Sequence, residues 1–340
     1  MIEKISKPND LTSEESVFAI QNILSGAVSA EEIAAFLMGY RMKGQTTEEL
    51  TAFVREMRKA ALNVEVDTAN AVDLCGTGGD KSGTFNISTT AMFVAAGAGV
   101  PVLKHGNRSI SSRSGSYDVL RYLGAYPDLN KTQVELLFRE TGMAFMFAPN
   151  FHPALKYVMP VRRALKVRTF FNMLGPLLNP AGVRRQIIGT FSKEASVKMI
   201  QILRNLDTEH VFTFYSEDGL DEISTSAGTH LNEFEHSTGD VTSKRFQPED
   251  LGFSRSSLKQ LAGGEAEENA GIMLDILSNR ATDAQRDVVL LNAAFAILVS
   301  GLAGSLQEGK ERAIKSIDSG EAKRKLDLFI SETKRIVSLV

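Results

Sequence analysis

Residues 71–108 read AVDLCGTGGDKSGTFNISTTAMFVAAGAGVPVLKHGNR. Two short apolar runs in this stretch, 71–75 and 100–104, each end in a polar or glycine-rich turn. The residues between them, at 89–99, are small and apolar, which is typical of a tightly packed helix. A strand, a loop, a helix and a second strand in this order indicate an α/β domain with a parallel sheet.

The same order of elements returns later in the chain. RQIIGTF (185–191) and HVFTFYS (210–216) are predicted strands, and residues 194–206 between them are predicted to be a helix. Residues 291–340 have a helical pattern. The sequence therefore predicts a large α/β domain that ends in helices.

Residues 1–60 are predicted to form a small unit made of helices alone. Thr12 and Ser29 are each followed three positions later by Glu, which is the capping box of a helix start. A third helix is predicted to begin near Thr47, with an apolar stripe along one face.

The composition limits the class of protein. The chain has 340 residues, of which 43% are hydrophobic and 23% charged, with a formal net charge of -3. This charge gives no broad basic field, so nucleic acid is not expected as a partner. A single cysteine excludes an internal disulfide, and the N-terminal MIEKISKPND has no apolar signal core, so we expect a cytoplasmic protein. The longest apolar run, 288–304, contains Asn292 and Ser300 and is expected to be a buried helix, not a membrane span.

The glycine-rich loop suggests an anion site. GTGGD (76–80) follows the first strand, and NIST (86–89) opens the next helix. Loop amides together with a helix N-terminus at the carboxyl end of a parallel strand can bind a phosphate or a pyrophosphate. Ser88 and Thr89 either cap the helix or offer oxygen to an anion or a metal. The alternative is a tight turn with an ordinary cap, because short glycine patterns are not specific.

The second strand ends in a basic, hydroxyl-rich loop. Residues 104–120 read KHGNRSISSRSGSYDVL, so Lys104, His105 and Arg108 lie at the strand end. Because the two strands are adjacent, their loops should meet at one edge of the sheet. A solvated basic loop is the less favoured alternative. Asp118 is expected to support the start of the following helix.

These segments, in this order and spacing, resemble the anthranilate phosphoribosyltransferase family. GTGGD, NIST, KHGNR and SS-x-SGS carry the resemblance, and segments at 146–154, 161–180, 217–224 and 300–313 agree with it. It implies a nucleoside phosphorylase/phosphoribosyltransferase type of α/β fold. A small N-terminal all-helical domain (1–69, with a helical segment near 150–172) would be hinged to a large α/β domain (70–340) with a mostly parallel central sheet. It also implies a homodimer that forms through the helical domain.

The family transfers the phosphoribosyl group of phosphoribosyl pyrophosphate (PRPP) to the amine of anthranilate and releases pyrophosphate. The resemblance implies PRPP contacts at Gly76, Gly79, Asp80, Thr84, Asn86, Ile87, Ser88, Thr89, Lys104, His105, Gly106, Asn107, Arg108, Ser111, Ser112 and Ser116. It implies anthranilate contacts at Gly76, Asn107, His152 and Arg162. Lys104, His105, Asn107 and Arg162 are the candidate catalytic residues. Ser88, Asp221 and Glu222 match the ligands of one or two Mg²⁺ ions.

The residue types suit this chemistry. Displacing pyrophosphate from ribose by a neutral amine needs charge stabilisation and alignment more than a strong base. Magnesium takes hard oxygen ligands, so the adjacent Asp221 and Glu222 fit it, although a solvated acidic turn is the alternative. Arg162 can hold a carboxylate with two parallel hydrogen bonds, whereas Arg163 is expected to be a surface charge.

Several neighbouring residues have alternative interpretations. His105 and His152 either line the path of the acceptor or are core histidines. Arg168 is expected to hold structure, and Cys75 to pack rather than react. The chain reads SGSYDVLRYLG where the family usually has SGSADVLEALG, so Tyr117 and Arg121 depart from the pattern. If the Tyr117 ring points inward it alters the acceptor path, and if it points outward nothing follows.

Two other functions compete with this interpretation. A pyrimidine nucleoside phosphorylase shares the architecture but would need a pocket for a nucleobase and inorganic phosphate. A non-catalytic, nucleic-acid-binding relative should have a basic surface and a weakened metal site. The net charge of -3 and the presence of Asp221 and Glu222 argue against the second.

Overall fold

The computed structural model describes residues 1–80, 82–108 and 113–339. In this part of the chain seven strands form one sheet, in the order β3-β2-β1-β4-β5-β6-β7. The strands are β1 (Val72–Gly76), β2 (Val102–Gly106), β3 (Met143–Phe147), β4 (Arg185–Gly189), β5 (His210–Ser216), β6 (Thr229–Glu235) and β7 (Val241–Phe246). β3, β2, β1, β4 and β5 are parallel, and β6 and β7 continue antiparallel. The mostly parallel central sheet is therefore confirmed.

The N-terminal residues form helices, as predicted. They are α1 (Ile2–Ser6), α2 (Ser13–Ser25), α3 (Ala30–Lys43) and α4 (Thr47–Lys59). Thr12 and Ser29 each accept a hydrogen bond from a backbone N–H three residues on, and the Glu at that position completes both capping boxes. Thr46 caps α4 in the same way. The local sequence thus sets where three helices begin.

The remaining helices cover the two faces of the sheet. They are α5 (Ile87–Gly97), α6 (Ser116–Tyr122), α7 (Lys131–Thr141), α8 (Ala148–Phe151), α9 (Met159–Leu165), α10 (Phe171–Leu174), α11 (Lys193–Arg204), α12 (Ala266–Leu277), α13 (Asp283–Ser300), α14 (Leu306–Asp318) and α15 (Glu321–Val337). Short 3₁₀ turns are η1 (Pro153–Tyr157), η2 (Gly175–Leu178), η3 (Pro248–Leu251) and η4 (Leu258–Leu261).

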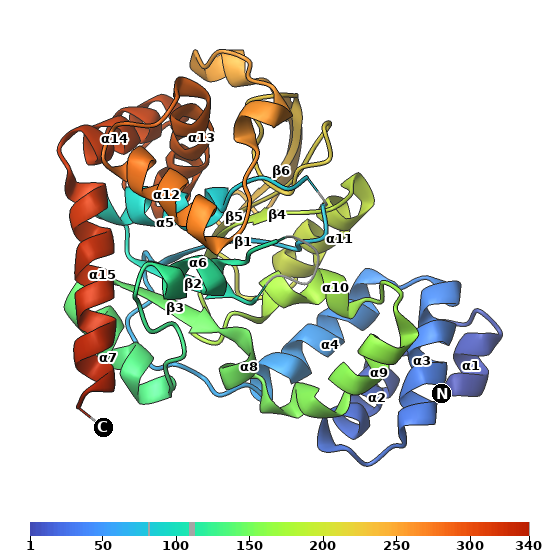
Figure 1. The fold of residues 1–340 in the computed structure, drawn as a ribbon. Coiled ribbons are helices and arrows are strands. Elements are labelled where there is room, and N and C mark those ends of the chain that lie inside the picture. Colours follow the sequence, from blue (N-terminus) through green and yellow to red (C-terminus); the bar gives the residue numbers. More distant parts are fainter. Residues whose placement is uncertain (81, 109–112, 340) are drawn as a thin grey trace.

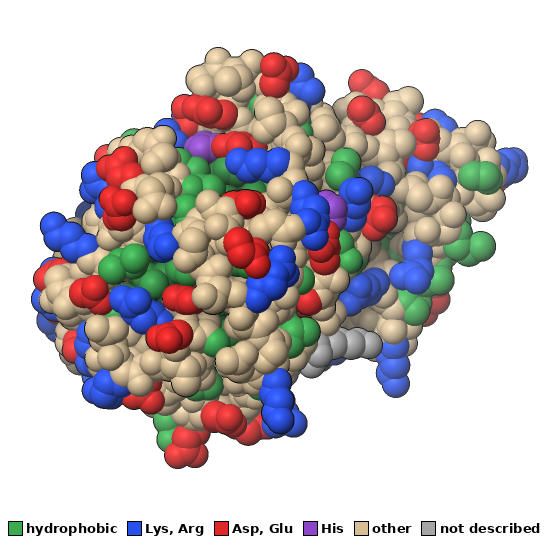
Figure 2. Space-filling view, turned by 90° about the horizontal axis from the view of Figure 1, so that it is seen from above, with side chains coloured by type: hydrophobic (Ala, Val, Ile, Leu, Met, Phe, Trp, Pro, Cys, Tyr) green, Lys and Arg blue, Asp and Glu red, His purple; other side chains and the backbone are tan. Residues whose placement is uncertain are grey.

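The helices form two groups in space. In Figure 1 α1–α4 gather at one end of the molecule together with α9, whereas α12–α15 lie on the far side of the sheet. The face in Figure 2 carries Lys and Arg side chains interspersed with Asp and Glu, so neither sign of charge dominates it. No helix in the described ranges is long and apolar enough to cross a membrane. The domain boundaries and the cytoplasmic location stay predictions.

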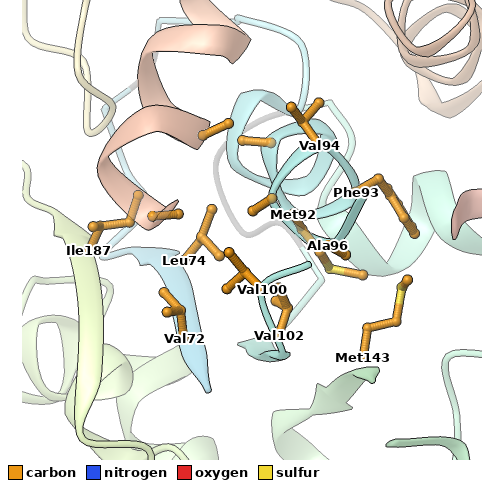
Figure 3. Packing of buried hydrophobic residues seen from close by; sticks show 14 of the residues in the cluster. Val72, Leu74, Met92, Phe93, Val94, Ala96, Val100, Val102, Met143 and Ile187 are labelled. Carbon is orange, nitrogen blue, oxygen red and sulfur yellow. The ribbon is translucent and has the colours of Figure 1, made fainter. Parts of the chain in front are cut away.

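Helix α5 is the centre of the larger hydrophobic core. Met92, Phe93, Val94 and Ala96 on this helix pack with Val72, Leu74, Val102 and Met143 of the sheet (Figure 3). The helix is rich in small residues because other helices approach it closely: a Cβ on Gly97 would lie 2.3 Å from Ser316 Oγ of α14. Every residue of α5 except Ser88 and Gly97 is buried.

A second core cluster connects the N-terminal helices to the opposite face of the sheet. It runs from α2, α3 and α4 through α9, α10 and η2 to α11, and includes Ile188 and Val211 of the sheet. Phe170 lies 5.6 Å from Tyr40 and 5.0 Å from Phe53, ring centre to ring centre. The segment over residues 153–178 therefore shares a core with the N-terminal helices.

Candidate active site

A cavity of about 750 Å³ lies at the carboxyl ends of β1 and β2. Such a position is where open α/β sheets bind ligands, and the size suits a small-molecule site. Its wall contains Gly76, Gly79, Asp80, Thr84, Asn86, Ile87, Ser88, Lys104, His105, Gly106, Asn107, Arg108, Ser116, His152, Arg162, Asp221 and Glu222. The two strand-end loops therefore meet at one edge, as the sequence predicted.

One predicted residue among those described, Thr89, is not on the cavity wall. Thr89 is fully buried, and its hydroxyl donates to Ser116 Oγ at 2.7 Å, so it lies behind the cavity wall. Ser111 and Ser112 lie outside the described residues. Asn107 and Arg108 are exposed at the cavity rim, and Asn107 Oδ1 accepts a hydrogen bond from the Arg108 N–H at 2.8 Å.

The glycine loop has a backbone that other residues rarely adopt. Gly78 and Gly79 have φ angles of 67° and 81°, in the left-handed region. Of the two alternatives for Ser88 and Thr89, the structure does not show the cap of α5, because the cap position is Asn86 and it makes no side-chain cap. Asn86 instead donates to Ser114 O at 3.3 Å and accepts from Asn269 Nδ2 at 3.0 Å. The first turn of α5 is thus held by distant parts of the chain.

Two glycines at the strand ends make room for an acidic turn. Gly76 and Gly189 are paired in the sheet, and residues 217–222 pack onto them. A Cβ on Gly76 would lie 2.5 Å from Asp221 Oδ2, and a Cβ on Gly189 would lie 1.7 Å from the Asp221 carbonyl oxygen. Glycine is therefore required at both positions by the close approach of Asp221.

Asp221 and Glu222 form a pair of enclosed carboxylates beside the helix N-terminus. Asp221 Oδ2 accepts from the Gly78 N–H at 2.7 Å, and Glu222 Oε1 accepts from the Ser88 N–H at 3.1 Å. Burial raises the pKa of both carboxyl groups, and the neighbouring Asp80 raises that of Asp221 further. Two enclosed carboxylates with raised pKa values are a site where a cation is favoured.

The donor set fits magnesium and not a metal cage made by the protein alone. Within the described ranges no three His, Cys, Asp or Glu side chains are grouped so that they could enclose a metal ion. Two carboxylates and the Ser88 hydroxyl are hard oxygen donors, and Mg²⁺ usually completes its coordination with water and substrate phosphates. Asp221, Glu222 and Ser88 could therefore hold Mg²⁺ that also binds a phosphorylated ligand.

Lys104 is a buried cation between the two loops. Its side chain donates to the Leu74 carbonyl and, at 3.3 Å, to Ser88 Oγ. Behind it lies Asp73, which is fully buried and accepts from the His105 N–H at 3.1 Å and from Asn179 Nδ2 at 2.9 Å. Burial raises the pKa of Asp73 to about 6, and the charge of Lys104 opposes this rise. Asp73 was not among the predicted residues. An Asp inside an apolar strand is nevertheless a signal for a buried carboxylate that accepts hydrogen bonds from neighbouring residues.

Two neutral histidines line the cavity side by side. The ring centres of His105 and His152 are 5.1 Å apart. Burial lowers the pKa of His105 to about 3 and that of His152 to about 4. Nε2 of each ring is buried without a hydrogen-bond partner among the residues described. Buried polar atoms are normally paired, so these two atoms are candidates to contact a ligand.

Arg162 faces the same cavity from α9. Its guanidinium lies 5.4 Å from the Phe171 ring centre and donates to Met159 Sδ at 3.5 Å. No acidic side chain in the described part of the chain forms a salt bridge with it. Burial lowers its pKa. Arg163 is exposed, as expected, but it also lies on the cavity wall.

The residues expected to be structural make contacts within the protein, although Arg168 and Cys75 also line the cavity. Arg168 donates to the Gly79 carbonyl at 2.6 Å and its guanidinium lies 4.4 Å from the Phe191 ring centre. Asp118 accepts from the Gly115 N–H at 2.9 Å at the start of α6. Cys75 is buried with the apolar residues of the second cluster, and burial raises the pKa of its thiol.

The chain is similar to known proteins over its whole length. Residues 68–323 match the glycosyl transferase family α/β domain, and residues 1–61 match the helical bundle domain of the glycosyl transferase family. The anthranilate phosphoribosyltransferase of Salinibacter ruber is 48% identical over 340 residues, with 99% of each chain covered.

Solved structures agree with this. The crystal structure of anthranilate phosphoribosyltransferase from Thermus thermophilus superposes with a TM-score of 0.91 at 35% identity, covering 98% of this chain and 99% of that chain. The Saccharomyces cerevisiae enzyme in complex with PRPP and Mg has a TM-score of 0.88 at 27% identity, covering 98% of this chain and 97% of that chain. The chain therefore belongs to the anthranilate phosphoribosyltransferase family.

Proposed function

We propose that this protein transfers the 5-phosphoribosyl group of PRPP to the amine of anthranilate, giving N-(5-phosphoribosyl)anthranilate and pyrophosphate in tryptophan biosynthesis. One observation supports this above the others. This chain is 48% identical, over its whole length, to an anthranilate phosphoribosyltransferase. It also places the glycine loop, the buried Lys104 and the acidic pair Asp221 and Glu222 around one cavity. These are the groups that a diphosphorylated sugar needs.

The phosphate side of the site is formed by the strand-end loops. The Gly78 and Ser88 N–H groups hold the two carboxylates, so the other N–H groups of the glycine loop and of the first turn of α5 bind phosphate oxygens. Lys104 supplies positive charge as pyrophosphate leaves. Lys104 is held by the Leu74 carbonyl and Ser88 Oγ, so its position is fixed before substrate binds. Such preorganised charge stabilises a transition state without reorganisation.

Asp221, Glu222 and Ser88 would hold one or two Mg²⁺ ions. When bound, Mg²⁺ neutralises charge on the departing pyrophosphate. The protein's part is to keep both carboxylates in place, which it does through the Gly78 and Ser88 N–H groups. The S. cerevisiae enzyme was solved in complex with PRPP and Mg, which supports a Mg²⁺ requirement.

The acceptor side is formed by the segment over residues 152–178. Arg162 binds the carboxylate of anthranilate, and Phe171, Leu155 and Met159 provide an apolar wall for its ring. Nε2 of His105 or His152 can accept a hydrogen bond from the amine, because burial lowers both pKa values and keeps the rings uncharged at neutral pH. Asn107 lies at the rim where the two substrates meet.

Two features of assembly belong to the same proposal. The helical unit is hinged to the α/β part, so that PRPP and Arg162 come together when the hinge closes. The protein forms a homodimer through the helical unit, which exposes Phe18 (59%) and Met42 (84%). The pyrimidine nucleoside phosphorylase and nucleic-acid-binding alternatives are not favoured, since the full-length relative with 48% identity is an anthranilate phosphoribosyltransferase.

Anthranilate fluorescence tests the proposal. Anthranilate is fluorescent and its ribosylated product much less so, so turnover appears as a loss of signal when PRPP and Mg²⁺ are present. The anthranilate signal should fall only when the protein, PRPP and Mg²⁺ are all present. No loss of signal, or turnover of thymidine with phosphate instead, would contradict the proposed activity.

A further inference from the structure

Tyr117 and Arg121, two of the residues that depart from the family pattern, form one structural unit. Tyr117 is buried in the first turn of α6, and its hydroxyl donates to Asp128 Oδ2 at 2.8 Å. Arg121, one helical turn later, donates to the Tyr117 hydroxyl oxygen at 3.3 Å. Asn150 Nδ2 donates to the other oxygen of Asp128 at 3.1 Å. The phenol group is therefore fixed at both its donor and its acceptor positions.

This explains why the departures occur together. An acidic residue at position 121, as the family pattern has, could not donate to the phenol oxygen and would lie near the charge of Asp128. An arginine there donates to the phenol oxygen, and its charge is opposite to that of Asp128. Asp128 accepts from the Tyr117 hydroxyl and Arg121 donates to it, so these hydrogen bonds hold the ring of Tyr117 in a single orientation.

The ring faces Arg108 at the rim of the cavity. Tyr117 packs against Phe147, with ring centres 4.4 Å apart, and Phe147 pairs in the sheet with Gly106. Arg108, two residues beyond Gly106, therefore extends over this aromatic pair. Its guanidinium lies 4.3 Å from the Tyr117 ring centre and 5.6 Å from that of Phe147. Among the described residues, the Tyr117 ring makes no ring contact with His105, His152 or Arg162. The two histidines contact each other, and Arg162 contacts Phe171.

We propose that Tyr117 is a positioning residue for PRPP, which holds the guanidinium of Arg108 at the cavity rim through the face of its ring. The inference rests on the proposed function for the identity of the ligand. Arg108 is exposed and its side chain has many rotamers, so an unsupported arginine would lose conformational entropy when it binds an anionic group of PRPP. A ring that already holds the guanidinium reduces this loss.

The test is a double-mutant cycle on PRPP affinity, measured by calorimetry with Mg²⁺. Tyr117→Leu fills much of the buried volume without a ring face, and Tyr117→Phe keeps the ring but loses the hydroxyl. Tyr117→Leu should weaken PRPP binding by about 2- to 5-fold, as expected for a cation–π contact at an exposed site. Tyr117→Phe should weaken it less. In an Arg108→Ala background, Tyr117→Leu should have no further effect.

Tyr122→Leu is a matched control, because Tyr122 lies on the same helix and is 54% exposed. It should leave PRPP affinity unchanged. The KM for anthranilate should not change in Tyr117→Leu, which separates this role from an effect on the acceptor path.

An equal loss of PRPP affinity from Tyr117→Leu with and without Arg108 would overturn the inference, as would no loss with Arg108 present. An increased KM for anthranilate alone would overturn it too. A wild-type protein that binds PRPP but does not consume anthranilate would overturn the proposed function and leave the cycle measurable.

Discussion

Replacing Gly76 with alanine tests whether the space at this position serves the acidic pair or the acceptor. The added methyl group would lie 2.5 Å from Asp221 Oδ2 and 3.0 Å from its Cγ, where ordinary contacts begin at 3.4 Å. The carboxylate must therefore move by roughly 1 Å, since the strand backbone is held on both sides by the sheet. Such a shift breaks the 2.7 Å hydrogen bond from the Gly78 N–H.

The size of the effect follows from that bond. A hydrogen bond to a charged group contributes about 1.5–3 kcal/mol, which corresponds to about a 10- to 100-fold change in an equilibrium constant. If Asp221 holds Mg²⁺, the half-saturating Mg²⁺ concentration should rise by about this factor in the Gly76→Ala variant. The KM for anthranilate should stay close to that of the wild type.

The assay is a Mg²⁺ titration of anthranilate turnover, followed by fluorescence at fixed PRPP. Gly271→Ala is a suitable control, because a Cβ at Gly271 in α12 meets no atom within 4 Å. It should leave the titration unchanged and, as alanine in a helix, stabilise the fold by about 0.5–1 kcal/mol. An unchanged Mg²⁺ response together with a raised anthranilate KM would show that Gly76 serves the acceptor, and the reasoning from Asp221 would be wrong.

Three further predictions concern the acceptor side, pH and the hinge. Arg162→Ala should raise the anthranilate KM by about 10- to 100-fold and keep the affinity for PRPP, whereas Arg163→Ala should change the anthranilate KM less. Equal effects of Arg162→Ala on the anthranilate KM and on the PRPP affinity would remove Arg162 from the acceptor site. The pKa of His152 is lowered from 6.5 to about 4 in the folded protein. Between these two pH values the unfolded chain binds a proton at His152 that the folded protein does not bind. The contribution of this group to the free energy of unfolding is therefore complete above pH 6.5 and is lost as the pH falls toward 4. His152→Gln removes this contribution. Denaturant titrations at pH 7 and pH 5 should therefore show the free energy of unfolding of the variant gaining on that of the wild type by about 2 kcal/mol in total, and a difference independent of pH would contradict the buried neutral histidine. PRPP with Mg²⁺ should reduce the radius of gyration in solution scattering if the hinge closes, whereas superimposable curves with and without ligand would speak against closure.

The sequence predicts the frame of the site because the relevant signals are local. Strand, glycine loop and helix follow one another at 71–99. Neighbouring parallel strands have their carboxyl ends at the same edge of the sheet, so the loops that follow them lie close together. The capping boxes at Thr12 and Ser29 likewise depend on four consecutive residues.

What the sequence does not predict depends on contacts between distant segments. The reason for glycine at 76 is Asp221, far along the chain, and the partner of Asp73 is Asn179. The orientation of Tyr117 could not be predicted because Asp128 and Phe147 determine it. The role of Ser88 and Thr89 stayed open because both fit the residue preference for a helix cap, whereas Asn86 takes the cap position and its side chain bonds to distant Ser114 and Asn269.

A crystal structure with PRPP and Mg²⁺ would locate the substrate. We expect the pyrophosphate beside the glycine loop and the first turn of α5, with Lys104 next to it and the metal on Asp221 and Glu222. PRPP bound away from the ends of β1 and β2, or a site left empty at saturating PRPP, would contradict the account.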